Sequence, residues 1–187
     1  HLHRKSQNTS EWQILNELKD SLSQEAFERI KIVNLGGGLP AEYRSYTSKV
    51  LPYIYSKLKE ASDWLKAKNI TPYIEPGRFL AAPCIELEAE IIQIYENTIV
   101  INTSIYTCAL DTVLTNTKML VKKEGEDSEK WDYYLIKGNS PTRDDIFRYK
   151  VKLHSPEVGD KITFLNAGAY NYATDFFGYK KLKTIIK

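Results

Sequence analysis

Cysteine, long apolar runs and an excess of one charge are scarce in this sequence. Its 187 residues include 2 cysteines, too few for a disulfide framework or a cysteine-based zinc site and typical of a reducing cytoplasm. Its apolar stretches fall far short of the roughly 20 residues that a membrane-spanning helix needs. The 26 basic and 24 acidic side chains leave a net charge of +2, with no sustained basic face. We therefore expect a cytoplasmic protein with no nucleic-acid partner, no membrane segment and no metal site.

Aromatic side chains, in contrast, are plentiful. The chain has 13 Tyr, 6 Phe and 3 Trp within a composition that is 42% hydrophobic, which is enough to fill the core of one or two ordinary domains. Disordered chains are poor in such residues. The sequence therefore predicts a folded protein with buried aromatic side chains.

The first 79 residues alternate helical and strand patterns. Apolar residues recur at helical spacing over residues 10–29 and again from 43 to 68, where Asn69 fits a C-terminal cap. Short apolar segments at 31–35 and 71–74 are typical of strands. This order is that of parallel α/β units, in which the loops that follow the strands hold the chemistry.

From residue 80 onward the pattern is mostly that of β-strands. The segments with alternating or β-branched residues are 87–94, 98–105, 131–136, 149–153 and 162–165. We therefore divide the chain into an α/β domain over residues 1–79 and an all-β domain over residues 80–187.

Two loops that follow the predicted strands carry unusual residues. Gly36, Gly37 and Gly38 have no Cβ and tolerate positive φ, so their N–H groups can approach an anion, although a plain tight turn would need the same residues. The segment from Glu75 to Arg78 combines a carboxylate with a guanidinium, which suits a phosphate site or a simple surface salt bridge. Because both loops follow strands of successive α/β units, we expect them to lie side by side.

Four segments in a fixed order extend this pattern over the whole chain. They are His1–Gln7, with the form His-x-His-x-x-Ser-Gln, the triple-glycine segment 34–40, Glu-Pro-Gly-Arg at 75–78, and Asn-Ala-Gly-Ala-Tyr at 166–170. The set resembles that of the fold-type III pyridoxal-phosphate decarboxylases, which comprise diaminopimelate, ornithine and arginine decarboxylases. The resemblance implies the C-terminal part of a β/α (TIM) barrel, followed by a β-sandwich or barrel-like domain.

The resemblance also implies an activity and its partners. The cofactor would be pyridoxal 5'-phosphate, the substrate an amino acid such as diaminopimelate, ornithine, lysine or arginine, and the assembly a homodimer with shared active sites. The Schiff-base lysine of the family precedes its His-x-His segment, so we expect it to lie outside this chain. A non-catalytic relative or fragment that binds and regulates family subunits is the main alternative. An amino-acid racemase of the same fold is a further one.

Each candidate site residue takes its role from the resemblance. Glu75 would face the pyridine nitrogen and keep it protonated, and His3 would stack on the cofactor ring; these two are the candidate catalytic residues. The other cofactor contacts would come from Ser6, Gly36, Gly37, Gly38, Gly77, Arg78 and Tyr170.

The segment 138–145 resembles the one that reaches into the neighbouring subunit's site. Pro141 stands where the family has a reactive cysteine, which puts the return of a proton to the decarboxylated carbon in question. Thr142 replaces an acidic substrate contact, and Asp145 keeps the acid that closes the motif. We therefore name Thr142 and Asp145 as candidate substrate-binding residues.

Because the matching lysine is expected to lie outside the chain, we predict that these 187 residues alone are catalytically silent. Pyridoxal phosphate should then form no specific adduct. The test is to mix chain and cofactor, reduce with borohydride and map the modified lysines by mass spectrometry. Sparse labelling spread over surface lysines is expected, whereas stoichiometric labelling of one lysine would refute the prediction.

Overall fold

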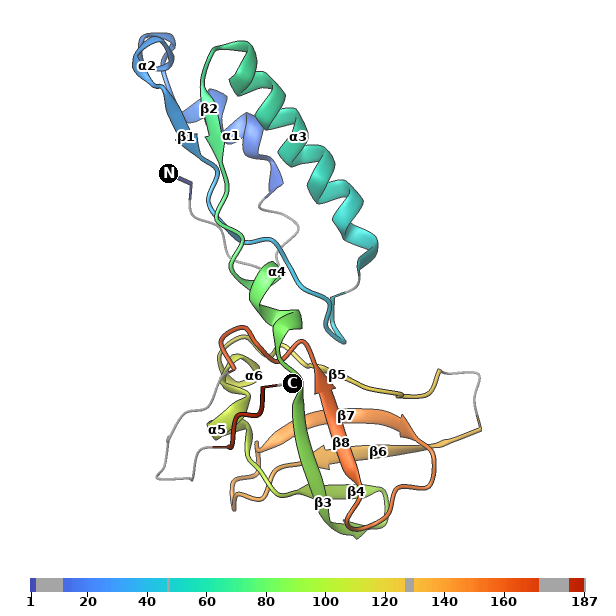
Figure 1. Cartoon of the computed structure of the whole chain (residues 1–187). Helices are drawn as coiled ribbons and strands as arrows, with labels where there is room; N and C mark the ends of the chain where they lie inside the picture. Colours follow the sequence, from blue (N-terminus) through green and yellow to red (C-terminus); the bar gives the residue numbers. More distant parts are fainter. Residues whose placement is uncertain (3–11, 47, 127–129, 172–181, 187) are drawn as a thin grey trace. The chain divides into compact units, whose positions relative to one another are not determined.

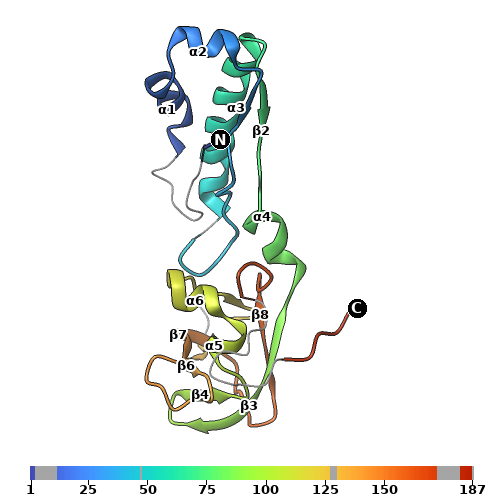
Figure 2. The ribbon, with the colours of Figure 1, turned by 90° about the vertical axis from the view of Figure 1, so that its left-hand side faces the viewer.

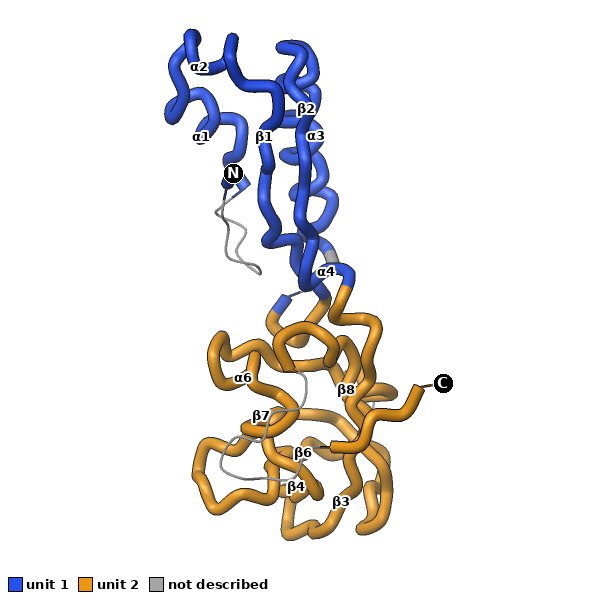
Figure 3. The backbone as a smooth tube through the Cα atoms, turned by 60° about the vertical axis from the view of Figure 1, so that its left-hand side comes forward, with its two compact units in different colours: residues 1–41, 46–80 blue, residues 42–45, 81–187 orange. Residues whose placement is uncertain are grey.

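A computed structural model describes residues 1–2, 12–46, 48–126, 130–171 and 182–186. The chain divides into two compact units, shown in different colours in Figure 3: unit 1 comprises residues 1–41 and 46–80, and unit 2 comprises residues 42–45 and 81–187. None of the helices in these described ranges is both long enough and apolar enough to span a bilayer. The candidate residues His3 and Ser6 lie outside the described residues.

Unit 1 is built around two short parallel strands. Strand β1 (Ile32–Asn34) pairs with β2 (Thr71–Tyr73), and helix α3 (Leu51–Ala67) connects them (Figure 1). Helices α1 (Ile14–Ser21) and α2 (Gln24–Arg29) precede β1. In Figure 2, α1 and α3 lie on the same side of β2. The unit therefore contains one β-α-β connection of the kind that parallel strands require.

The two faces of this small sheet differ in their environment. Val33 is 6% exposed and belongs to the same apolar core as Ile54 of α3. Ile32 and Tyr73 are 57% and 53% exposed, and they lie on the opposite face because side chains alternate along a strand. Asn34 shares the face of Ile32 for the same reason. Helices therefore cover one face of the sheet, while the other presents apolar side chains to solvent.

The prediction of one continuous helix over residues 10–29 is wrong, because the segment contains two helices. Helix α1 ends at Ser21, and Ser23 then caps α2, its hydroxyl oxygen accepting the N–H of Ala26 at 3.2 Å. Serine is among the preferred residues at a helix N-cap because its side chain satisfies a free backbone donor. The apolar period runs through this break, which is why the pattern alone suggested a single helix.

Helix α3 begins later than its apolar pattern predicts. The pattern starts at Tyr43, but the helix starts at Leu51, after a 3₁₀ turn η2 (Ser48–Val50). Pro52 lies in the first turn, where its fixed φ suits the helix and its missing N–H leaves no bond unmade. At the other end Asn69 has φ +58°, the left-handed conformation that terminates helices, as predicted.

Unit 2 contains a six-stranded sheet. Its strands are β3 (Leu87–Tyr95), β4 (Thr98–Ile101), β5 (Leu120–Val121), β6 (Asp132–Lys137), β7 (Ile146–Leu153) and β8 (Lys161–Leu165). The spatial order is β5-β8-β3-β4-β6-β7, and every neighbouring pair is antiparallel except β4 and β6. Short α4 (Arg78–Ala81) and η3 (Ala82–Cys84) precede β3.

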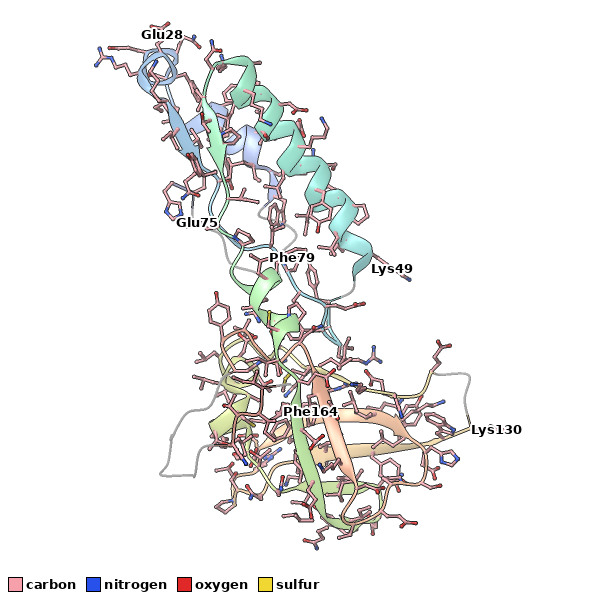
Figure 4. The ribbon with its side chains drawn as sticks, in the orientation of Figure 1. Glu28, Lys49, Glu75, Phe79, Lys130 and Phe164 are labelled. Atoms are coloured by element: carbon pink, nitrogen blue, oxygen red, sulfur yellow. The ribbon has the colours of Figure 1, made fainter. Side chains whose placement is uncertain are left out.

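This sheet curls until it is nearly closed. The rings of Phe147 on β7 and Phe164 on β8 lie 5.0 Å apart between centroids, although these strands are not neighbours in the sheet (Phe164 is labelled in Figure 4). Beyond β5, the N–H of Gly125 donates to the carbonyl of Lys152 on β7 at 3.0 Å. The barrel-like β-structure predicted for the second half is confirmed, and the β/α-barrel assignment of the first half stays a prediction.

The strand predicted over residues 98–105 is wrong in its second half. Strand β4 ends at Ile101, and Ser104 caps helix α5 (Ile105–Cys108), its hydroxyl oxygen accepting the N–H of Tyr106 at 3.3 Å. Helix α6 (Leu110–Thr115) follows. As at Ser23, a serine cap starts a helix here. The β-branched composition of the segment had predicted that the strand would continue.

The left-handed conformation of Asn69 leads to a stability prediction. Alanine at φ +58° suffers a steric cost of about 1 kcal/mol, whereas glycine suffers none. We expect Asn69→Ala to lower the free energy of unfolding by about that amount. Asn69→Gly should leave it nearly unchanged, as should Lys66→Ala, a control within α3. Urea unfolding followed by tryptophan fluorescence measures this, and equal stability of the alanine and glycine variants would contradict it.

Candidate functional site

The carboxylate of Glu75 lies at the carboxyl edge of the small sheet in unit 1. Tyr73, the last residue of β2, pairs with Asn34, the last residue of β1. The side-chain amide of Asn34 donates to Oε1 of Glu75 at 2.6 Å, and Nε2 of His1 lies 3.2 Å from Oε2. The Glu75 side chain is still 58% exposed (Figure 4 labels it). Asn34 therefore fixes the orientation of a carboxylate that remains open to a ligand.

The triple-glycine loop packs directly against this carboxylate residue. The N–H of Gly36 donates to Oδ1 of Asn34 at 2.8 Å, and its carbonyl accepts the N–H of Glu75 at 2.8 Å. A Cβ on Gly37 would collide with the carbonyl oxygen of Glu75. Gly36 also has φ +72°, a conformation that residues with side chains rarely adopt. Gly36 and Gly37 are thus needed for the close approach of the two loops.

Two backbone donors of the loop are available for an anion. The N–H of Gly36 is used by Asn34, whereas those of Gly37 and Gly38 donate to no acceptor in the described part of the chain. Adjacent free N–H groups are the usual lining of anion-binding loops. The glycine loop therefore combines a structural requirement with two donors that can bind a phosphate oxygen.

Gly77 and Arg78 follow Glu75 into helix α4. The carbonyl of Gly77 accepts the N–H of Leu80 at 3.2 Å, and Arg78 is the first residue of the helix. The Arg78 residue is only 4% exposed. A buried guanidinium requires compensating contacts, so Arg78 is part of the interior rather than a solvated surface charge.

Unit 2 holds the candidate residue Thr142 in a small hydroxyl cluster, which we define as Tyr106, Ser140 and Thr142. The hydroxyl of Thr142 donates to the Tyr106 phenol oxygen at 3.2 Å and lies 2.8 Å from the hydroxyl of Ser140. None of the three carries a charge at neutral pH. Where the resemblance would place an acidic substrate contact, the described residues therefore place neutral hydroxyl groups.

Asp145 is fully buried, and the backbone of its own unit satisfies its carboxylate. Oδ1 accepts the N–H of Ile105 at 2.9 Å, and Oδ2 accepts the N–H of Ser140 at 3.0 Å, with 0% of the residue exposed. A Cβ on Gly138 would collide with both oxygens. These contacts join the segment 138–145 to the start of α5. They give Asp145 an ordering role, while the substrate contact stays a prediction.

Tyr170 lies at the end of a tightly packed segment of unit 2. The N–H of Gly168 donates to the carbonyl of Ala82 at 3.0 Å, and a Cβ on Gly168 would collide with the carbonyl of Ala81. Tyr170 itself has φ +58° and is 63% exposed. Left-handed backbone is uncommon for a tyrosine, and residues in such strained conformations cluster at functional sites as well as in turns.

Cys108 is not a substitute for the reactive thiol that the resemblance places at Pro141. Burial raises the pKa of the Cys108 thiol to about 11. The thiol donates to the carbonyl oxygen of Ser104 at 3.2 Å and remains protonated at neutral pH. A buried, protonated thiol is a poor nucleophile and a weak acid.

Two side chains of these clusters are not among the candidate site residues named from the sequence. Asn34 could have been, because it ends β1 opposite Tyr73 and so must lie beside a residue just past β2. Tyr106 is 36 residues from Thr142, and its contact depends on the way the segment 138–145 folds back on α5. No local pattern in the sequence indicates such a contact.

Comparison with known proteins identifies the fold. Neither a family model nor a curated protein sequence matches the chain. Solved structures do. The arginine decarboxylase of Paramecium bursaria Chlorella virus bound to agmatine matches 96% of this chain at 24% identity and TM-score 0.68. The lysine decarboxylase of Selenomonas ruminantium matches 100% of this chain at 18% identity and TM-score 0.73. The lysine/ornithine decarboxylase of Vibrio vulnificus, complexed with cadaverine, matches 99% of this chain at 19% identity and TM-score 0.71.

The chain spans about half the length of these solved structures, covering 50%, 50% and 53% of them respectively. The resemblance to fold-type III pyridoxal-phosphate decarboxylases is thereby confirmed at the level of fold. Coverage of about half of each neighbour is consistent with a C-terminal portion of such a protein.

The buried contacts of Asp145 lead to a stability prediction, for which the adjacent Asp144 provides the control variant. In Asp145→Asn, an amide NH₂ replaces one of the two accepting oxygens, so one buried backbone N–H loses its partner. We expect the free energy of unfolding to fall by about 1–3 kcal/mol. Asp144→Asn, at an exposed adjacent position, should change it by less than about 0.5 kcal/mol. Thermal and urea unfolding measure both variants, and equal stabilities would exclude the ordering role.

Proposed function

We propose that this chain is the C-terminal half of a pyridoxal-phosphate-dependent amino-acid decarboxylase. Residues 1–79 would form the end of the cofactor-binding β/α barrel, and residues 80–187 would form the β-domain. The observation that carries the proposal is the carboxylate of Glu75, held by Asn34 at 2.6 Å beside a glycine loop in which two N–H groups have no acceptor among the described residues. The fold shared with solved decarboxylases supports the same reading.

The exposed face of the small sheet supports the barrel. Parallel sheets in α/β proteins are covered on both faces, yet Ile32 and Tyr73 are 57% and 53% exposed. In a β/α barrel, this face would be the packed interior. Asn34 lies on it at the carboxyl end of its strand, where barrel enzymes place their active sites.

The described residues fit the cofactor. Glu75 can accept a hydrogen bond from a protonated pyridine nitrogen, and Asn34 keeps its carboxylate in one orientation. Gly37 and Gly38 offer N–H groups to a phosphate. When bound, pyridoxal phosphate supplies the electron sink for the loss of CO₂. We propose Arg78, Gly77 and Tyr170 as further cofactor contacts, with His3 and Ser6 from outside the described residues.

The substrate we propose is an amino acid of the diaminopimelate, ornithine, lysine or arginine group. Two of the solved neighbours hold the amines agmatine and cadaverine. Thr142 of the hydroxyl cluster would contact the substrate through a hydrogen bond, and Asp145 would hold the segment that carries it. We further propose a homodimer in which the segment 138–145 completes the partner subunit's site.

A non-catalytic relative is the second candidate, and one observation favours it. Pro141 stands between Ser140 and Thr142, where the family has its reactive cysteine, and the buried thiol of Cys108 does not replace it. In this reading the chain would bind and regulate subunits of the family without turning over a substrate, whether or not the glycine loop and Glu75 bind the cofactor. Binding and catalysis must therefore be measured separately.

The experiment uses the complete open reading frame that contains this chain. Purified protein with pyridoxal phosphate is assayed for CO₂ release from the four amino acids. In Glu75→Gln we expect kcat to fall about 10²-fold, the usual effect of removing one electrostatic stabiliser. The affinity for the cofactor, measured by absorbance titration, should change by less than about tenfold. Glu28→Gln, an exposed carboxylate in α2 before β1 (Figure 4), is the matched control and should behave as wild type.

The outcomes separate the two candidates. CO₂ release that depends on Glu75 but not on Glu28 supports the decarboxylase. Tight cofactor binding without CO₂ release from any of the four substrates supports the non-catalytic relative. Full activity of Glu75→Gln would remove Glu75 from the site and overturn the role that carries the proposal.

A further inference from the structure

Unit 2 contains a cavity of about 290 Å³ that the proposed function does not use. It lies where the two edges of the curled sheet approach each other, between the turn after β5 and the end of β7. All the residues that line it are described residues of unit 2. The mouths and seams of β-barrels are common places for small-molecule sites.

The cavity is widely open to solvent, with apolar side chains at its floor and aromatic side chains on one side. Ile91 of β3 and Ile162 of β8 are 1% and 5% exposed and belong to the buried part of its lining. Trp131 and His154 form an aromatic wall, with ring centroids 5.5 Å apart and an edge-to-face angle of 74°. An indole and an imidazole held edge to face form a corner against which another ring can pack.

The rim of the cavity is cationic. It carries Lys122, Lys123 and Lys161. Glu86 pairs with Lys122 at 3.0 Å and Glu88 pairs with Lys161 at 2.6 Å, so these two lysines are partly neutralised. Lys123 forms no ion pair with a carboxylate of the described residues. Among the described residues, its ammonium group is therefore the rim charge that a ligand could bind.

One carboxylate also lines the cavity, and it is already engaged. Oδ2 of Asp160 accepts the N–H of Glu157 at 2.9 Å, which closes the turn between β7 and β8. Because Lys122 and Lys161 are paired with Glu86 and Glu88, Lys123 is the cation of the lining that forms no ion pair among the described residues, while Asp160 is held by the turn. Any anionic group of a ligand would therefore be held at Lys123.

The turn that carries the rim lysines is held in place at both ends. The N–H of Lys122 donates to the carbonyl of Thr163 at 2.8 Å. At the other end Glu124 pairs with the buried guanidinium of Arg148 at 2.7 Å, and the N–H of Gly125 donates to Lys152. A site whose backbone is already fixed loses little conformational entropy when it binds a ligand.

We propose that this cavity binds a small amphipathic anion, with a single apolar ring against Trp131 and a carboxylate or phosphate group at Lys123. Its volume is near the lower end of the roughly 300–1,000 Å³ that ligand pockets occupy, which limits the ligand to about one ring. The apolar interior disfavours a bare inorganic anion, and the cationic rim disfavours a neutral ring. This site is independent of the cofactor loop in unit 1.

Phenyl phosphate is a suitable probe because it combines both features. Its affinity is measured by isothermal titration calorimetry on the 187-residue chain, beside inorganic phosphate and benzyl alcohol, which each lack one feature. Amide and indole NMR shifts locate the bound probe. We expect saturable binding of phenyl phosphate alone, with shifts at the Trp131 indole and at Lys123.

Matched variants test the two halves of the site. Lys123→Gln should raise the Kd of phenyl phosphate about fivefold, because an exposed charge contributes modestly. Trp131→Ala should raise it about tenfold through the loss of the aromatic wall. Lys49→Gln changes an equally exposed lysine in unit 1 (Figure 4) and should leave the Kd unchanged.

Three results would overturn the proposal. The first is no saturable binding of phenyl phosphate below about 10 mM, which is weaker than a specific site requires. The second is an affinity for inorganic phosphate equal to that for phenyl phosphate, which would show that the ring contributes nothing to binding. The third is a set of NMR shifts confined to Gly37 and Gly38, which would place the probe on the glycine loop of unit 1.

Discussion

The side-chain amide of Asn34 is the contact on which the candidate site of unit 1 depends. Its nitrogen donates to the carboxylate of Glu75 at 2.6 Å, and its oxygen accepts the N–H of Gly36 at 2.8 Å. The amide supplies a donor and an acceptor on one side chain, whereas an aspartate could hold the loop but would repel Glu75. The parallel register of Asn34 with Tyr73 brings these groups together. A one-residue slip would send Asn34 to the helix-covered face and separate them.

Two carboxylates of the chain show how burial decides what an acid can do. Asp145 is 0% exposed, and both its oxygens accept backbone N–H groups of the same unit, so it orders a segment. Glu75 is 58% exposed, with the Asn34 amide on one oxygen and the half-exposed His1 imidazole 3.2 Å from the other, so solvent and a ligand can still reach it. A buried carboxylate must be fully hydrogen-bonded by the protein, whereas an exposed one can exchange solvent for a ligand. The motif that each residue belongs to does not reveal this difference.

The sequence predicted elements well where one periodic pattern dominates and less well where a single side chain interrupts it. Both strands of unit 1 and the left-handed cap at Asn69 follow from apolar runs and local chemistry. Ser23 and Ser104 each cap a new helix inside a segment that was predicted as one continuous element. The spacing of apolar residues does not indicate where such a cap lies. The contact of Tyr106 with Thr142 spans 36 residues and depends on tertiary packing alone. Local physics therefore predicts elements and loops, while contacts between distant segments need the folded chain.

The uncovered face of the small sheet connects stability with chemistry in the proposed decarboxylase. Fully burying a side chain the size of an isoleucine contributes about 1.5–3 kcal/mol, so leaving Ile32 and Tyr73 57% and 53% exposed forgoes part of that stabilisation. Further strands of a barrel would recover it by packing on the same face. Asn34 lies on that face at the carboxyl end of β1, beside Glu75. The packing that would stabilise unit 1 would then also exclude water around the Glu75 carboxylate, and electrostatic contacts to a cofactor are stronger in such an environment. In the proposed enzyme, completion of the barrel and completion of the active site are therefore the same event.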